Sequence, residues 1–167
     1  MRRLANLPPD HPMTSPYYQG EMSLDLAGFT GIELAEVLVH GYDIAKATGR
    51  PWPIAADDAR LALRAALPLT PALVNPETAH GHTGGYELRI RGGPRVVFRF
   101  ADGHVSLEEP GDQPVHRHVL AEPVALRLVM YGRIPQWGPI AKGQLLTWGI
   151  RPGGRWASCG CSSPPDP

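Results

Sequence analysis

Residues 86–108 of this chain read Tyr-Glu-Leu-Arg-Ile-Arg-Gly-Gly-Pro-Arg-Val-Val-Phe-Arg-Phe-Ala-Asp-Gly-His-Val-Ser-Leu-Glu, and they decide the fold of its second half. Apolar and polar residues alternate in three runs, which is the period of a β-strand with one buried face. The runs are residues 86–91, 95–100 and 104–108. Gly92-Gly-Pro and Asp102-Gly separate the runs, and Asp-Gly is a strong hairpin signal. We therefore expect an antiparallel meander with one face on a core.

Three further elements are expected after the meander. Residues 115–120 fit a fourth strand. Pro123 stands where the first turn of a helix tolerates proline, directly before an amphipathic run at 124–131. A loop rich in Gly, Pro and Trp then leads to residues 144–150, whose leucines and tryptophan suit a last strand.

The pattern before the meander is helical. A first helix is expected at about residues 22–48, with Gly49 as its C-cap. A second helix is expected at 59–67, where Asp57 or Asp58 can serve as the N-cap. The fold class predicted from these elements is α+β.

The composition changes between and after these two parts. Residues 68–84 contain three prolines and fit a linker or a short irregular turn. Residues 153–167 are low in apolar side chains, so we expect a disordered tail there. The predicted organisation is thus a helical part at 1–67, a β-rich part at 85–152 and the tail.

The overall composition argues against several classes of partner. The 16 basic and 16 acidic residues cancel, so nothing indicates nucleic acid or an anionic membrane. No run approaches the ~18 apolar residues of a membrane span, and the first residues lack the apolar stretch of a secretory signal. The only cysteines, Cys159 and Cys161, are too close to bridge with relaxed geometry. We therefore expect a reducing, cytoplasmic location.

One polar stripe, formed by Glu36, His40 and Asp43, runs along the otherwise apolar first helix. At ~100° per residue the three side chains fall within an arc of about 60°. A helix so apolar is normally buried, and buried charges are costly unless they pair, hydrogen-bond or hold a metal. Glu-x-x-x-His places two metal-competent groups one turn apart. Asp43 could ligate, orient His40 or act as a base. The alternative is a half-exposed face whose charges meet water.

The remaining histidines give two further pairs. His80 and His82 lie in a Gly-containing loop, where such a pair is either a weak metal site or simply solvated. His116 and His118 share one face of the expected fourth strand, and we expect a structural role for them.

Arg133 and two tryptophans complete the set of candidate residues. Arg133 follows the helix expected at 124–131, so it either closes that helix electrostatically or points into a cleft towards an anionic substrate. Trp137 and Trp148 are expected to fill the core or to rim a pocket.

Residues 36–52, Glu-Val-Leu-Val-His-Gly-Tyr-Asp-Ile-Ala-Lys-Ala-Thr-Gly-Arg-Pro-Trp, resemble a stretch of the maleylpyruvate isomerase-like, mycothiol-dependent enzymes of actinobacteria. The Glu-x-x-x-His-x-x-Asp spacing and the following Ala-Thr-Gly-Arg-Pro carry this resemblance. From Tyr86 through Arg133 to Pro152, the chain is similar to the C-terminal domain of the same family. That domain is itself similar to sterol-carrier-type lipid-binding folds.

The resemblance implies a DinB-like helical bundle that holds a divalent metal, usually zinc, followed by a sterol-carrier-like antiparallel sheet with a short helix. It implies Glu36 and His40 as metal ligands, and it gives catalytic roles to Asp43 beside the metal and to Arg133. In this family the metal is thought to activate the thiol of mycothiol, so that the thiolate attacks an electrophile. The implied activity is metal-assisted isomerase or thiol-transferase chemistry on a small anionic substrate.

The chain differs from this family in the residues that precede the helix expected at about 22–48, which we call the motif helix. The residues before position 22 are too few for the earlier bundle helices, and the family's third ligand, a histidine on one of them, has no counterpart. His11 is the sole upstream histidine, and it stands beside Pro12 in a segment without a helical pattern. We therefore expect one or two helices of the bundle and an N-terminally truncated enzyme that is incomplete as this chain.

Two other functions remain open. The first is a sterol-carrier-like small-molecule or lipid-binding module without catalysis. Its alternating strands and its aromatic, Gly/Pro-rich loop could border an apolar cavity. The second is a degraded gene product without a function, in which a truncated helix exposes its apolar face.

Overall fold

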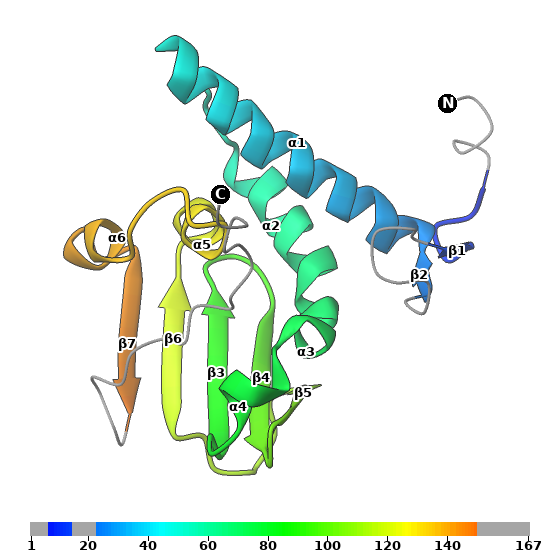
Figure 1. Ribbon diagram of the computed structural model, residues 1–167, viewed down its shortest axis with the longest axis vertical. Helices are drawn as coiled ribbons and strands as arrows, with labels where there is room; N and C mark the ends of the chain where they lie inside the picture. Colours follow the sequence, from blue (N-terminus) through cyan, green and yellow to red (C-terminus); the bar gives the residue numbers. More distant parts are fainter. Residues whose placement is uncertain (1–6, 15–22, 150–167) are drawn as a thin grey trace. The chain divides into compact units, whose positions relative to one another are not determined.

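The computed structural model describes residues 7–14 and 23–149 (Figure 1). The chain divides into two compact units, residues 1–66 and residues 67–167, and each is taken by itself below. The tail predicted at 153–167, with Cys159 and Cys161, lies outside the described residues. None of the helices in the described ranges combines the length and the apolar character needed to cross a bilayer.

The first unit contains a short hairpin and two helices. Strands β1 (Pro12–Thr14) and β2 (Ser23–Asp25) pair antiparallel, and helix α1 (Leu26–Thr48) follows directly. The helix begins at Leu26 rather than at residue 22 because Asp25 is its N-cap, with a carboxylate oxygen that accepts from Gly28 N at 2.7 Å. Its other end confirms the prediction, since Gly49 adopts the left-handed conformation of a C-cap.

Helix α2 (Ala56–Ala66) packs against α1 through small residues. It begins earlier than predicted, so Asp57 and Asp58 lie within its first turn, where carboxylates suit the positive end of the helix dipole, rather than at the cap. The buried cluster between the helices consists of Ala35, Leu38 and Ala62. A Cβ atom at Gly31 would lie 2.4 Å from Ala65 Cβ, so the two backbones approach closely there.

Helical turns occupy most of the segment predicted as a linker. A 3₁₀ turn, η2 (Leu67–Leu69), is followed by α3 (Thr70–Leu73) and α4 (Pro76–Ala79). Both α3 and α4 carry proline in the first turn, where its missing N–H costs nothing. The Asn75 side chain caps α4 by accepting from Glu77 N at 2.8 Å. The prolines therefore start short helices here rather than breaking the chain into an irregular turn.

The second unit is built on a five-stranded sheet, in the order β5-β4-β3-β6-β7 (Figure 1). Its strands are β3 (Gly84–Ile90), β4 (Arg95–Ala101), β5 (His104–Glu108), β6 (Arg117–Ala121) and β7 (Leu145–Gly149). Strands β3, β4 and β5 form the predicted antiparallel meander. The α+β class is thus confirmed.

One strand pair departs from the predicted antiparallel sheet. Strand β6 pairs parallel with β3, while β7 pairs antiparallel with β6. The cause is the connection at residues 109–116, which leaves β5 at one edge and enters β6 beyond β3. The sheet is therefore mixed, and this connection has to cross β4 and β3.

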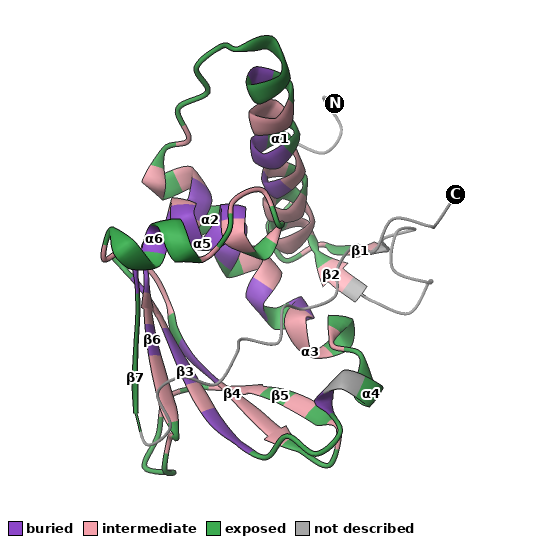
Figure 2. Ribbon diagram, turned by 60° about the vertical axis from the view of Figure 1, so that its left-hand side comes forward, coloured by how far each residue is buried: buried purple, intermediate pink, exposed green. Residues whose placement is uncertain are grey.

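Two short helices flank the last strands. Helix α5 (Pro123–Met130) has Pro123 in its first turn, as predicted, and Glu122 caps it by accepting from Ala125 N at 2.8 Å. The loop predicted between α5 and the last strand contains a further helix, α6 (Trp137–Ala141), which contacts β7. Strand β7 forms the edge of the sheet and is largely exposed (Figure 2).

The two faces of the sheet differ in chemistry. One face carries the apolar core of this unit, and its buried strand residues are Leu88, Ile90, Val96, Val119, Ala121 and Leu145. The other face carries most of the charged side chains of the strands, because side chains alternate between the faces. We call it the Glu87 face, after the central residue of β3, which is buried.

The close approach of α1 and α2 predicts that Gly31→Ala lowers the free energy of unfolding by about 1–3 kcal/mol, because the added methyl group overpacks the helix contact. Urea unfolding followed by circular dichroism measures this change. The matched control is Gly138→Ala in α6, where nothing lies within 4 Å of the new Cβ atom. An unchanged midpoint for Gly31→Ala would show that the helices are not in contact at this point.

Candidate functional site

Glu87 lies in the middle of a row of residues that crosses all five strands. The residues paired in this row are Glu108, Val97, Glu87, His118 and Trp148. The Glu87 side chain is only 1% exposed. A carboxylate buried to this degree needs partners that replace its water.

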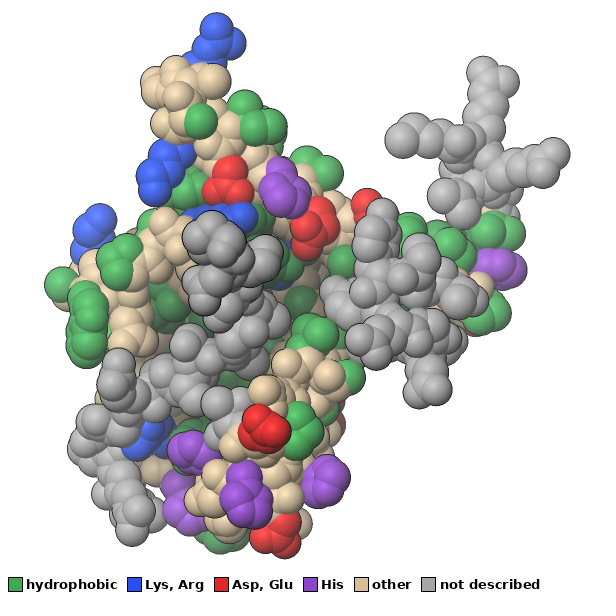
Figure 3. Space-filling view, viewed as in Figure 1, with side chains coloured by type: hydrophobic (Ala, Val, Ile, Leu, Met, Phe, Trp, Pro, Cys, Tyr) green, Lys and Arg blue, Asp and Glu red, His purple; other side chains and the backbone are tan. Residues whose placement is uncertain are grey.

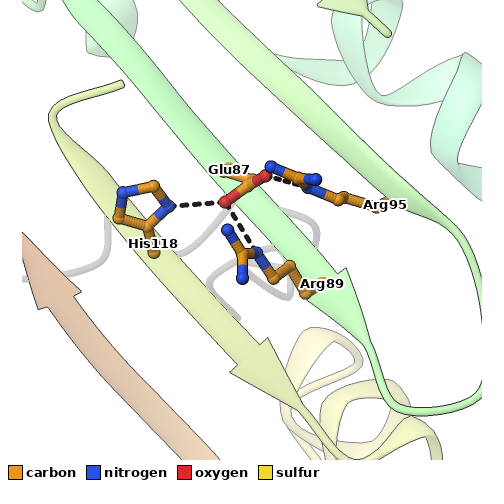
Figure 4. Close-up of polar contacts among 4 residues, drawn as sticks. All are labelled: Glu87, Arg89, Arg95 and His118. Atoms are coloured by element: carbon orange, nitrogen blue, oxygen red, sulfur yellow. Dashed lines mark hydrogen bonds and ion pairs between the residues drawn. The ribbon is translucent and has the colours of Figure 1, made fainter. Parts of the chain in front are cut away.

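Three cationic or protonatable side chains supply those partners (Figure 4). Arg95 donates its Nε–H to Glu87 Oε1, while Arg89 Nε donates to Oε2 at 2.7 Å. His118 Nδ1 lies 2.5 Å from the same Oε2. Both oxygens of the carboxylate are thus engaged, by side chains from β3 itself and from both neighbouring strands.

These contacts control the ionisation of the carboxyl group. Burial by itself would raise the pKa of Glu87, but the hydrogen bonds from His118, Arg95 and Arg89 oppose burial and hold the pKa at about 2. The group is therefore a carboxylate throughout the neutral range.

A pocket of about 200 Å³ adjoins this cluster. Its walls come from the sheet and from the connection that crosses it, and they are Glu87, Arg95, Val97, Pro110, Gly111, Gln113, Val115 and His118. The connection leaves β5 after Glu108 and reaches β6 just before His118, so it spans the same row of residues. Three strand spacings amount to about 14 Å, which residues 109–116 can span while arching over the sheet.

Two hydrogen bonds with Gly85 fix the end of this connection. His116 N donates to Gly85 O at 2.8 Å, and Gly85 N donates back to His116 Nδ1 at 3.0 Å. A Cβ atom at Gly84 would lie 2.9 Å from His116 Nδ1, so glycine permits the close approach. The structural role predicted for His116 agrees with these contacts, whereas His118 belongs to the pocket.

An apolar strip continues the row towards the edge of the sheet. The Trp148 ring stacks on the His118 ring, with centroids 5.3 Å apart and planes 16° apart. The Arg89 guanidinium lies 5.6 Å from the Trp148 ring centroid. Leu120 and Leu146 pair with each other on the same face, and Leu146 and Trp148 are 42% and 41% exposed. Trp148 therefore lies exposed beside His118, a residue that lines the pocket, rather than in the core.

The stripe predicted on the first helix is present but exposed. His40 Nε2 lies 3.2 Å from Glu36 Oε2, and His40 Nδ1 lies 3.8 Å from Asp43 Oδ2. The side chains of Glu36, His40 and Asp43 are 43%, 63% and 36% exposed. Figure 3 shows a histidine between acidic side chains over α1. The stripe therefore lies on a half-exposed face, which was the alternative to a buried site, and Val37 and Ile44 are exposed as well.

This arrangement does not provide three ligands that converge on one ion. Each carboxylate approaches a different nitrogen of His40, so the two acids face opposite sides of one ring. In the described part of the chain, no group of three or more His, Cys, Asp or Glu side chains is placed to hold a metal. The residues as they stand thus fit a two-ligand contact at most, and zinc at Glu36 and His40 stays a prediction.

The structure places Arg133 at the end of α5. Its Nη1 donates to Tyr131 O at 2.7 Å, and its backbone N–H donates to Leu128 O at 2.8 Å. This contact matches the helix-closing role considered for Arg133, and a catalytic role for it stays a prediction. Trp137 is exposed on α6 rather than in the core.

Sequence reasoning missed Glu87 and Arg95 as site residues. In the alternating pattern of 86–91, Glu87 reads as an ordinary solvent-facing residue of a strand. One pattern in the sequence could have indicated the site. In the alternating strands of the meander, Arg89, Arg95 and Arg99 fall on the same face of the sheet as Glu87.

Comparisons with known proteins give partial structural similarity. No protein-family model and no curated protein sequence matches the chain. A double mutant of the sec-alkyl sulfatase PisA1, whose wild-type enzyme is from Pseudomonas sp., superposes with a TM-score of 0.48 at 14% identity, over 55% of this chain and 15% of the sulfatase. The ubiquinone synthesis protein UbiJ-SCP2 gives a TM-score of 0.36 at 18% identity, over 56% of this chain and 81% of that protein. Sterol Carrier Protein 2 from Yarrowia lipolytica, in its apo form, gives 0.31 at 14% identity, over 77% and 93%.

The comparisons give no support to the predicted relationship to mycothiol-dependent enzymes. The structures found include Sterol Carrier Protein 2. At these identities and scores the likeness carries no functional information, so function has to be argued from the Glu87 face.

The buried carboxylate predicts a pH-dependent stability. Because the pKa of Glu87 falls from 4.5 to about 2 on folding, its contribution is complete above about pH 4.5 and is lost as the pH falls towards 2. We expect Glu87→Gln to lower the free energy of unfolding at pH 7 by about 3 kcal/mol, and the difference from the unsubstituted protein to vanish near pH 2. Urea unfolding at a series of pH values measures it.

The matched control for this prediction is Glu109→Gln. Glu109 is exposed in the connection next to the sheet, so its substitution should leave the pH profile unchanged. Parallel pH profiles for the unsubstituted protein and Glu87→Gln would contradict the assignment of this stability to Glu87.

Proposed function

We propose that the second unit of the chain, hereafter the sheet unit, is a small-molecule or lipid-binding module that binds its ligand on the Glu87 face. The observation that carries this proposal is the pocket under the connection, which opens beside an exposed apolar strip. Ligand sites combine apolar walls with a few polar groups that fix orientation. Here Trp148 and Leu146 supply the apolar surface, while Arg95 and His118 supply polar groups.

The geometry supports binding rather than catalysis at this face. The only carboxylate that lines the pocket, among the described residues, is Glu87, and its two oxygens are already engaged by three partners. A general base must be within reach of a substrate proton and must take it up near neutral pH. A carboxyl with a pKa of about 2 is poorly suited to that task.

Binding of a dansyl-labelled fatty acid, followed by its fluorescence, tests the proposal. We expect Leu146→Asn to weaken binding by about tenfold, since burying a leucine side chain is worth about 1.5–3 kcal/mol. The matched control is Leu61→Asn, which replaces another exposed leucine, on α2 of the other unit, and should leave the affinity unchanged. The proposal fails if no probe binds, or if both substitutions weaken binding equally.

As a second candidate, we propose the metal chemistry predicted from the motif helix. Glu36 and His40 would each give one ligand to a zinc ion, with Asp43 in support, and mycothiol and an anionic substrate would follow from the family resemblance. What favours this candidate is that Glu36 Oε2 and His40 Nε2 lie 3.2 Å apart on an accessible helix face. The ion would need further ligands from elsewhere, because two hold it weakly.

Zinc titration by calorimetry tests the second candidate. We expect the unsubstituted protein to bind one zinc ion and the Glu36→Ala/His40→Ala variant to bind none. The control, Glu77→Ala/His80→Ala, removes another exposed Glu and His pair, at α4, and should bind zinc as the unsubstituted protein does. Equal zinc uptake by all three proteins would rule out a site at Glu36 and His40.

A further inference from the structure

We propose that Arg95 forms a subsite for the carboxylate of an amphipathic monocarboxylic acid, with Glu87 as the residue that positions its guanidinium and with His118 in the wall of the same pocket. This inference rests on the proposed binding function of the Glu87 face and names the class of ligand.

The Glu87 carboxylate engages the inner nitrogens of its two pocket-lining partners. It takes the inner Nε of Arg95 and the Nδ1 of His118. Among the described residues none pairs with the two terminal nitrogens of Arg95, and the Arg95 side chain is 55% exposed. Both side chains line the pocket. Glu87 therefore fixes the orientation of the Arg95 guanidinium, whose two terminal nitrogens are left to donate to a ligand.

The charges around Glu87 do not balance. Arg89 and Arg95 bring two positive charges to the single negative charge of Glu87. The neighbouring pair of Arg99 and Glu108, with Nε 2.9 Å from Oε2, is neutral by itself. The acidic residues of the connection, Glu109 and Asp112, are exposed and do not line the pocket. One positive charge is left over, which a single carboxylate would balance.

The pocket is small. Pockets that enclose whole drug-sized ligands occupy about 300–1,000 Å³, whereas this pocket has about 200 Å³. It can accept a polar head but not a lipid chain. The apolar strip of Trp148 and Leu146 begins where the pocket ends, because Trp148 stacks on His118. A head group in the pocket would thus place an attached chain on exposed apolar surface.

The planar fork of an arginine favours a carboxylate as the head group. The two terminal nitrogens of a guanidinium match the spacing of the two oxygens of a carboxylate. A neutral ester of the same chain keeps the apolar contacts but loses the charge. Comparing an acid with its ester therefore isolates the proposed subsite from the apolar strip.

The experiment compares a dansyl-labelled fatty acid with its methyl ester at pH 7. We expect the acid to bind about tenfold more tightly than the ester, the effect of a charged hydrogen bond worth about 1.5 kcal/mol. Arg95→Gln should reduce the affinity for the acid to that for the ester and leave the ester unchanged. Unchanged ester binding also shows that the variant is folded.

Arg99→Gln is the matched control, because it removes a positive charge from the same face of β4 without touching the pocket. Its effect on the acid should stay below about twofold at 0.15 M salt, where screening weakens distant charges. Two results would overturn the subsite while leaving the binding function intact. One is equal affinity of the unsubstituted protein for acid and ester; the other is an equal loss of affinity for the acid in Arg95→Gln and Arg99→Gln. Binding of neither probe would instead overturn the binding function itself.

Discussion

The sheet unit depends on the pairing of one buried carboxylate. Burying the Glu87 carboxylate costs several kcal/mol of hydration free energy, which only closely placed hydrogen-bond donors can offset. Those donors come from three strands, and His118 is paired directly with Glu87 across the parallel β3–β6 contact. A shift of β6 by one residue would turn His118 to the other face. The same contacts that keep the carboxylate ionised therefore specify the register of the mixed sheet.

The pocket follows from the topology that this pairing requires. Since β6 lies beyond β3, the chain must return across the sheet after β5, and residues 109–116 do so over the row that contains Glu87. An all-antiparallel meander would leave this face open. The crossing connection converts a charged strip of the sheet into a walled site. The edge strand β7, which pairs with β6, is largely exposed (Figure 2).

Local pattern predicted most of the elements of this chain but little of its site. The strands at 95–100 and 104–108 and the cap at Gly49 follow from periodicity and backbone conformation, which a short window of sequence contains. The partner of β6 depends on a crossing between distant residues, so the alternating pattern of 115–120 could not reveal it. Glu87 was missed for the same reason, because its partners at 95 and 118 become neighbours only through strand pairing. On α1 the three residues of the stripe do lie together. Their side chains are exposed, however, and the apolar composition of the helix could not predict that exposure.

The measurement that tests the central claim most directly is the titration of the Glu87 side-chain carboxyl carbon by ¹³C NMR in the folded protein. A carboxylate held by Arg95, Arg89 and His118 should titrate with a pKa of about 2. A midpoint near 4.5, the ordinary value for a glutamate, would contradict the account, because the carboxyl would then lack the cationic partners on which the register and the pocket depend.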